Sequence, residues 1–139
     1  MISINAPGKI LLIEDDKNIV LVEQLCLAAG GYQVMSATDG VQGLEMAFAE
    51  QPALILLDVV LPKINGYLVL EALQNNPLTQ NIPVLVTSAK AQADDIQRAY
   101  AYKIADYLVK PFTHQELLRK VSGILDREGD LSNENSDRG

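Results

Sequence analysis

Four acidic residues of this chain follow two apolar runs, at the points where β-strands are predicted to end. Asp58 comes directly after the uninterrupted run 53–57, which is typical of a parallel strand buried on both faces. An acidic triplet at 14–16 follows a second predicted strand at 9–13, which is apolar after Lys9. If these strands are neighbours in an open α/β sheet, their carboxyl ends meet at one crevice, where such sheets bind ligands. Carboxylates crowded in this way are costly without a cation, so the pattern predicts a hard divalent metal ion.

Magnesium is the ion that this set of carboxylates suits best. Mg²⁺ prefers six oxygen ligands, keeps several waters and takes only one or two carboxylates in most sites. Glu14, Asp15 and Asp58 can supply them. The alternative is that the acidic triplet is a solvated loop that caps the next helix. The position of Asp58 after a second buried strand favours the metal site over that alternative.

Two further strand ends bring a hydroxyl and an ammonium group toward the same edge. Thr87 follows the apolar run 84–86, and Lys110 follows 107–109. Beside a metal-bound carboxylate, such groups can bind the oxygens of a transferring phosphoryl group. Taken separately, Lys110 could be an ordinary surface lysine and Thr87 an ordinary strand residue. The agreement of four strand ends favours the chemical interpretation.

The elements that must position these residues alternate strand and helix five times. This alternation predicts a parallel sheet with helices on both faces. The last helix has a capping box, in which Thr113 and Glu116 satisfy each other's backbone N–H groups. The predicted strands are 9–13, 33–37, 53–57, 83–87 and 106–109, and the helices before the last are 17–29, 41–50, 66–74 and 91–101.

Composition narrows the class of protein. The chain has 139 residues and 48% apolar content, which is typical of one globular domain. A formal charge of −7 argues against direct binding of nucleic acid, which needs a basic face. The single cysteine, Cys26, excludes an internal disulfide and is predicted to be a buried, inert thiol. Because we find neither an apolar run long enough to span a membrane nor a signal peptide, we expect no membrane association and a cytoplasmic location.

The chain divides into three segments. Residues 1–8 are predicted to be an N-terminal extension, and residues 9–125 the folded domain. Residues 126–139 are predicted to be a disordered acidic tail, because one apolar residue, Leu131, cannot offset the entropy of ordering that stretch.

In order along the chain, five motifs resemble the receiver domain of two-component response regulators. The resemblance covers about residues 9–125 and implies the flavodoxin-like, doubly wound five-stranded parallel sheet, with strand order 2-1-3-4-5 and helices on both faces. The motifs are Ile13-Glu14-Asp15-Asp16, Leu56-Leu57-Asp58-Val59-Val60-Leu61-Pro62, Gly66, Val86-Thr87-Ser88-Ala89 and Lys110-Pro111-Phe112.

The resemblance assigns a role to each site residue. Asp58 would be the phosphoacceptor, and Lys110 would be the cation that binds the phosphoryl group. The Lys110-Pro111 peptide bond is expected to be cis. Thr87 would be the switch hydroxyl and Tyr107 the switch aromatic residue. The metal ligands implied for Mg²⁺ are Glu14, Asp15, Asp58 and the backbone carbonyl of Val60.

The resemblance also implies partners. The phosphoryl donor would be a sensor histidine kinase or a histidine phosphotransfer protein, and the output would be a changed interaction surface toward a downstream protein that the sequence does not identify. Dimerisation on phosphorylation stays open. Because we see no effector after Leu125, we expect a stand-alone receiver, and one that is not an enzyme beyond assisting its own phosphoryl transfer and loss.

Three other functions compete with this interpretation. A degenerate receiver, acting as an interaction module without phosphorylation, is the main alternative, although the acceptor, the acidic pair and the lysine are all present. A flavin-binding protein would need an anion-binding loop after the first strand, where this chain has acidic residues. An aspartate-nucleophile phosphatase would need a second acid two residues after Asp58, where Val60 stands.

Overall fold

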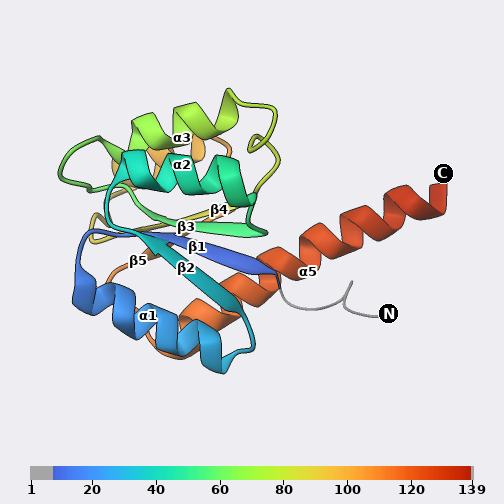
Figure 1. The fold of residues 1–139 in the computed structure, drawn as a ribbon, viewed down its shortest axis with the longest axis horizontal. Coiled ribbons are helices and arrows are strands. Elements are labelled where there is room, and N and C mark those ends of the chain that lie inside the picture. Colours follow the sequence, from blue (N-terminus) through green and yellow to red (C-terminus); the bar gives the residue numbers. More distant parts are fainter. Residues whose placement is uncertain (1–7, 139) are drawn as a thin grey trace.

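Five short apolar segments form one parallel sheet in the computed structural model, which describes residues 8–138 and side chains as far as Glu128. The sheet order is β2-β1-β3-β4-β5, as predicted for a flavodoxin-like fold. Figure 1 shows the sheet between two layers of helices. The strands are β1 Lys9–Ile13, β2 Gln33–Ala37, β3 Leu54–Asp58, β4 Val84–Ser88 and β5 Asp106–Val109.

Side chains alternate between two apolar cores on either side of the sheet, because successive strand residues point to opposite faces. In β1, Leu11 and Ile13 belong to one core, whereas Ile10 and Leu12 belong to the other. All four side chains have no exposed surface. The central strands are therefore apolar over most of their length, with polar residues at their ends, which explains why they read as continuous runs rather than as alternating patterns.

The helices divide between these two cores. The helices α1 and α5 lie on one side of the sheet, and α2 and α3 lie on the other (Figure 1). Helix α4 contributes Ala99 to the core shared with α2 and α3. The helix bounds are α1 Lys17–Ala29, α2 Gly40–Glu50, α3 Gly66–Gln74, α4 Ala93–Tyr100 and α5 His114–Arg138.

Polar side chains fix where most helices begin. Asp16 accepts hydrogen bonds from the backbone N–H groups of Asn18 and Ile19 at the start of α1. The predicted capping box of α5 is present, because Thr113 Oγ1 accepts from Glu116 N and Glu116 Oε1 accepts from Thr113 N, each at 3.0 Å. Every predicted strand and helix before α5 is present, with ends within two residues of the prediction.

Helix α5 extends further than the sequence predicts. Its last turns protrude from the domain (Figure 1). Residues 126–138 continue the helix instead of forming the disordered tail that we expected. The expectation rested on the lack of apolar residues for packing, but helical hydrogen bonds are local and no proline interrupts this stretch. Residues 1–7 of the predicted N-terminal extension, and Gly139, lie outside the described residues.

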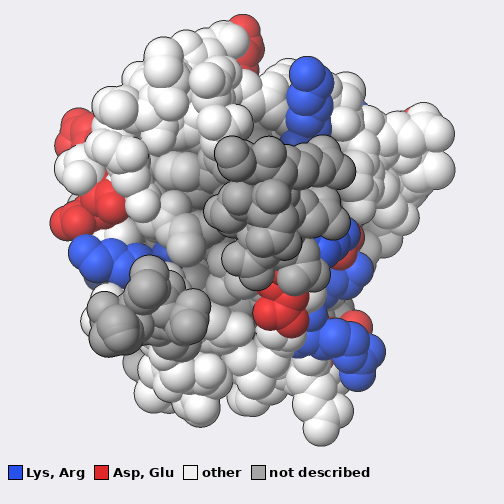
Figure 2. Space-filling view, turned by 90° about the vertical axis from the view of Figure 1, so that its right-hand side faces the viewer, with Lys and Arg blue, Asp and Glu red and all other residues white. Residues whose placement is uncertain are grey.

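The surface shows charges of both signs. Figure 2 shows the face at the protruding end of α5, where basic side chains stand beside acidic ones on the part that the structure describes. This view therefore shows no continuous basic surface among the described residues. Within residues 8–138, none of the helices combines the length and the apolar composition that crossing a membrane requires.

Candidate functional site

The carboxyl ends of four strands bring the predicted residues to one edge of the sheet. In the β1–β3 pairing Ile13 lies opposite Leu57, so Glu14 and Asp58 leave the sheet side by side. In the β3–β4 pairing Asp58 lies directly opposite Thr87. Lys110 follows Val109, the last residue of β5. The strand order thus converts residues far apart in sequence into one cluster.

Two of the three acidic side chains are buried. Glu14 is 3% exposed and Asp58 is 8% exposed, whereas Asp15 is exposed to solvent. One carboxylate oxygen from each of Glu14, Asp15 and Asp58 can be chosen so that all three lie within 4.8 Å of one another. Oxygens converging at this separation suit a divalent cation with water in its remaining positions, so the residues fit the predicted metal. The exposed side of the cluster, at Asp15, leaves room for those waters.

Lys110 supplies the positive charge at the centre of the cluster. Its ammonium group donates hydrogen bonds to Glu14 Oε1 and, at 2.9 Å, to Asp58 Oδ2. Burial raises the pKa of Glu14, against the opposing effect of the Lys110 ammonium group. Burial alone would lower the pKa of Lys110, but its hydrogen bonds to the two carboxylates raise it above the ordinary value. One lysine therefore pairs with two buried acids at once, which leaves one negative charge uncompensated.

The loop after β3 holds Asp58 in place. The backbone N–H of Val60 donates to Asp58 Oδ1 at 2.9 Å, which orients the carboxylate. Gly66 packs directly on this loop, and its N–H donates to the carbonyl of Val59 at 3.0 Å. A Cβ at position 66 would lie 2.3 Å from the Cα of Val59, so only glycine permits this approach.

The predicted switch residues occupy buried positions beside the cluster. Thr87 is 2% exposed and lies in β4, next to Asp58. Tyr107 is 7% exposed, and its hydroxyl donates to the backbone carbonyl of Lys90 at 2.7 Å. The tyrosine ring is therefore tied to the segment that follows β4, the strand that carries Thr87.

Two smaller predictions also hold. The Lys110-Pro111 peptide bond is cis. Cys26 is buried and is not in a disulfide. Its thiol lies 3.7 Å from the backbone carbonyl of His114, and burial raises the pKa of the thiol, which disfavours the reactive thiolate.

Sequence reasoning missed one ionisable residue near the site, Glu23 of α1. It is 4% exposed, and burial raises the pKa of its carboxyl to about 7. A signal was available, because Glu23 lies three residues after Val20 and four before Leu27, on the face of the helix that packs into the core. A polar residue at such a position breaks the apolar stripe.

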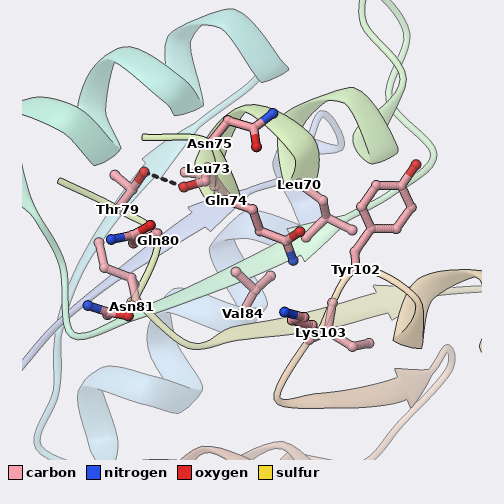
Figure 3. A pocket seen from close by; sticks show the side chains of 12 residues that line it. Leu70, Leu73, Gln74, Asn75, Thr79, Gln80, Asn81, Val84, Tyr102 and Lys103 are labelled. Carbon is pink, nitrogen blue, oxygen red and sulfur yellow. Dashed lines mark hydrogen bonds between the residues drawn. The ribbon is translucent and has the colours of Figure 1, made fainter. Parts of the chain in front are cut away.

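A cavity of about 420 Å³ lies at the opposite, amino end of β4. Figure 3 shows side chains from the end of α3, the segment before β4 and the segment before β5 around it. Its polar lining includes the amides Gln74, Asn75, Gln80 and Asn81, and the hydroxyl of Thr79 donates to the carbonyl of Leu73 at 2.7 Å. None of the predicted site residues lines this cavity.

Comparison with known proteins places the chain in a family. Residues 10–122 match the model of the response regulator receiver domain. Over 119 residues, the chain is 39% identical to the DNA-binding dual master transcriptional regulator RpaA of Synechocystis and 38% identical to the alkaline phosphatase synthesis transcriptional regulatory protein PhoP of Bacillus subtilis. Each match covers 86% of this chain and 49% of the relative. The chain thus spans about half the length of these relatives.

Solved structures agree with the sequence relatives. The chemotaxis response regulator CheY4 of Vibrio cholerae superposes with a TM-score of 0.81 at 25% identity, over 85% of this chain and 98% of that chain. The N-terminal domain of a response regulator receiver protein from Methanoculleus marisnigri has a TM-score of 0.70 at 35% identity, over 85% of this chain and 96% of that chain. The motifs, the strand order and these matches agree, and the chain belongs to the family of response regulator receiver domains of two-component systems.

Proposed function

We propose that this chain accepts a phosphoryl group on Asp58 from a phosphohistidine and signals through a changed interaction surface. The observation that carries the proposal is the shared contact of Lys110 with Glu14 and Asp58, beside a third carboxylate on Asp15. In this arrangement Asp58 contacts the Lys110 ammonium group and also lies beside the carboxylates of Glu14 and Asp15, which can act as metal ligands. A structural ion pair would need only one acid and one base.

The transfer step uses Asp58 as the nucleophile. One carboxylate oxygen of Asp58 forms a bond to phosphorus while the bond from phosphorus to the donor imidazole nitrogen breaks, and that nitrogen keeps the electron pair. As negative charge moves from the carboxylate to the oxygens of the transferred group, the Lys110 ammonium group can donate its hydrogen bond to those oxygens, because it already contacts Asp58. Thr87 lies opposite Asp58 in the adjacent strand, which supports a role for its hydroxyl as a donor to the same group.

Mg²⁺ would be held by Glu14, Asp15, Asp58 and the backbone carbonyl of Val60, and when bound it supplies charge neutralisation for the transferring phosphoryl group. This assignment is supported by the convergence of the three carboxylates. Without a cation they place like charges together around a single lysine.

The lifetime of the phosphorylated form depends on groups that could position water at the acceptor. Val60 and Ala89 flank the site in sequence, and both are exposed and apolar. Neither side chain can hydrogen-bond an attacking water. We therefore expect slow spontaneous loss of the phosphoryl group, with no enzymatic activity on other substrates.

The output depends on Thr87 and Tyr107. The ring of Tyr107 is buried, with its hydroxyl on the Lys90 carbonyl. A phosphoryl group on Asp58 would draw the Thr87 hydroxyl toward it. This movement would favour the conformation in which the Tyr107 ring is buried and its hydroxyl donates to the Lys90 carbonyl. The face formed by α4, β5 and α5 would then differ in affinity for a downstream protein. The Tyr107→Ala variant should still be phosphorylated but show a weaker change at this face in amide NMR spectra.

The donor in this proposal is a sensor histidine kinase or a histidine phosphotransfer protein, and the compartment is the cytoplasm. The downstream target is a protein rather than a nucleic acid or a membrane. The alternative of a degenerate interaction module is not favoured by any observation at the site, since the acceptor, the acidic pair and the lysine all converge there.

Incubation with acetyl phosphate and Mg²⁺, followed by intact mass measurement, tests the central step. The unmodified chain should gain the mass of one phosphoryl group. Asp58→Ala should abolish the gain, whereas Asp126→Ala, which removes an exposed acid on α5, should leave it unchanged. Labelling of the Asp58→Ala variant at the rate of the unmodified chain would show that the acceptor is a different residue.

A further inference from the structure

A second cavity, of about 400 Å³, lies between α1 and the segment that leads from β5 into α5. These two elements lie on the same side of the sheet (Figure 1). The walls are largely apolar and include Ile19 and Val22 of α1, Phe112, and Leu117 of α5. Lys110 lines one side, so the cavity adjoins the acidic cluster described above.

Glu23 is the acidic residue in the lining of this cavity. The side chain is 4% exposed, and its Oε2 atom has no hydrogen-bond partner among the described residues. A buried carboxylate without a partner is costly, because it has lost its water and gained nothing in return. The terminal torsion of a glutamate has broad minima, so either carboxylate oxygen can turn toward the cavity.

The surroundings do not satisfy Glu23 from within the protein. Lys110, the cation that acts electrostatically on Glu23, donates its hydrogen bonds to Glu14 and Asp58 instead. Burial is the main cause that raises the pKa of Glu23 to about 7; Lys110 acts to lower this pKa, while Glu14 and Asp58 act to raise it. Because Lys110 is shared by Glu14 and Asp58, it does not compensate Glu23, and His114, which also lines the cavity, makes no hydrogen bond to Glu23 Oε2. The carboxylate of Glu23 is thus left without a cationic partner among the described residues.

We infer that this cavity binds a small organic ammonium compound whose charged head pairs with Glu23 and whose apolar body packs against Val22, Phe112 and Leu117. The volume lies within the range of small-molecule sites, and the combination of apolar walls with a few polar groups, here Glu23, Lys110 and His114, is typical of them. An inorganic cation would leave the apolar walls empty, and a neutral apolar molecule would leave Glu23 unpaired.

The cavity in Figure 3 has a similar volume but supports no comparable inference. Its polar side chains are neutral amides apart from Lys103, and its buried hydroxyl, Thr79, already donates to a backbone carbonyl. The difference is that Glu23 is a buried carboxylate with an unpartnered oxygen, whereas Lys103 is exposed to solvent.

Titration with 2-phenylethylammonium, followed by amide NMR, tests this inference on the full chain. Saturable shifts should appear for residues around the cavity, such as Val22, Cys26 and Leu117. The neutral analogue 2-phenylethanol should bind about tenfold or more weakly, because it cannot form the charge-assisted hydrogen bond. Equal affinity for the two compounds, or no saturable shift with the amine, would overturn the inference.

The matched variants are Glu23→Gln and Glu71→Gln, the second of which changes an exposed glutamate on α3. Glu23→Gln should weaken amine binding about tenfold or more and should remove the preference over 2-phenylethanol, while Glu71→Gln should change neither. The dispersion of the amide spectrum verifies that each variant is folded. If Glu23→Gln is folded and binds the amine like the unmodified chain, Glu23 is not the anchor. The assay contains no phosphoryl donor, so its result is independent of the function proposed for Asp58.

Discussion

The two ends of the sheet use the same strands in opposite ways. At the carboxyl end, Glu14, Asp58 and Lys110 place charges in surroundings that are largely removed from solvent. At the amino end of β4, the cavity is lined mainly by neutral amides and apolar groups, and the buried hydroxyl of Thr79 has a partner at 2.7 Å. One end therefore concentrates charge that can act on a ligand, whereas at the other end the buried hydroxyl of Thr79 is satisfied within the protein.

This contrast shows where the domain gives up stability for chemistry. Buried charges cost free energy unless each has a partner, and the carboxyl end holds more acids than bases. The amino end carries no such cost among its described side chains. Substitutions at the two ends should therefore differ in the size, the sign and the pH dependence of their effects on stability.

Lys110→Ala should have the largest effect on stability. It leaves Glu14 and Asp58 buried without their shared cation, and breaking such a pair costs about 3 kcal/mol. Lys103→Ala, at the exposed lysine of the amino-end cavity, should change the free energy of unfolding by less than about 0.5 kcal/mol. Urea unfolding at pH 7 without metal measures both. Similar losses from the two variants would remove the contrast between the two ends.

Glu23→Gln should have the next largest effect, with the opposite sign. The pKa of Glu23 is raised from 4.5 to about 7, so between these values the folded state keeps a proton that the unfolded state has lost. The free energy of unfolding therefore falls by about 3 kcal/mol in total as the pH rises from 4.5 to 7, because the stability that protonated Glu23 contributes is lost.

The variant lacks this titration, so its stability relative to the unmodified chain should increase over the same pH interval. Thermal unfolding at pH 4.5, 6 and 8 measures the difference, with Glu71→Gln as the exposed control. A difference that stays constant across these pH values would mean that Glu23 titrates normally in the folded chain.

Thr79→Val should cost about 1–2 kcal/mol, because it leaves the carbonyl of Leu73 without the hydroxyl that donates to it. The loss should be the same at pH 5 and pH 8, since no ionisable group is involved. Phosphorylation by acetyl phosphate should proceed at the rate of the unmodified chain. A slower rate would show that the amino end influences the acceptor site.

Asp15→Asn should have the smallest effect on the metal-free chain, because Asp15 is exposed. Removal of one like charge beside Glu14 and Asp58 should raise the melting temperature slightly in the absence of Mg²⁺. The rise that Mg²⁺ produces by mass action in the unmodified chain should be mostly lost. Equal Mg²⁺-induced shifts in the two proteins would exclude Asp15 from the metal site.

The sequence predicts the fold and the acidic edge well because both depend on local pattern. A buried parallel strand reads as an apolar run, and the residue after it must lie at the sheet edge. Asp58, Thr87 and Lys110 could therefore be assigned to one edge before their contacts were known.

Other features depend on contacts that no local pattern reports. The hydrogen bond from Tyr107 to the Lys90 carbonyl requires the relative positions of β5 and the segment after β4. The ion pairs of Lys110 with both Glu14 and Asp58 form only because the ends of three strands pack together. The helical backbone of residues 126–138 was missed because its hydrogen bonds need no partner outside the helix.

The alternation along β1 has a consequence for insertions and deletions. Since Ile10 through Ile13 are all apolar and have no exposed surface, a deletion of one residue among them would still present apolar side chains to both cores. The same deletion would draw Glu14 back by about 3.3 Å and turn it toward the opposite face of the sheet. The core of this domain thus restricts which kinds of residue β1 contains, whereas the site at its end restricts how many.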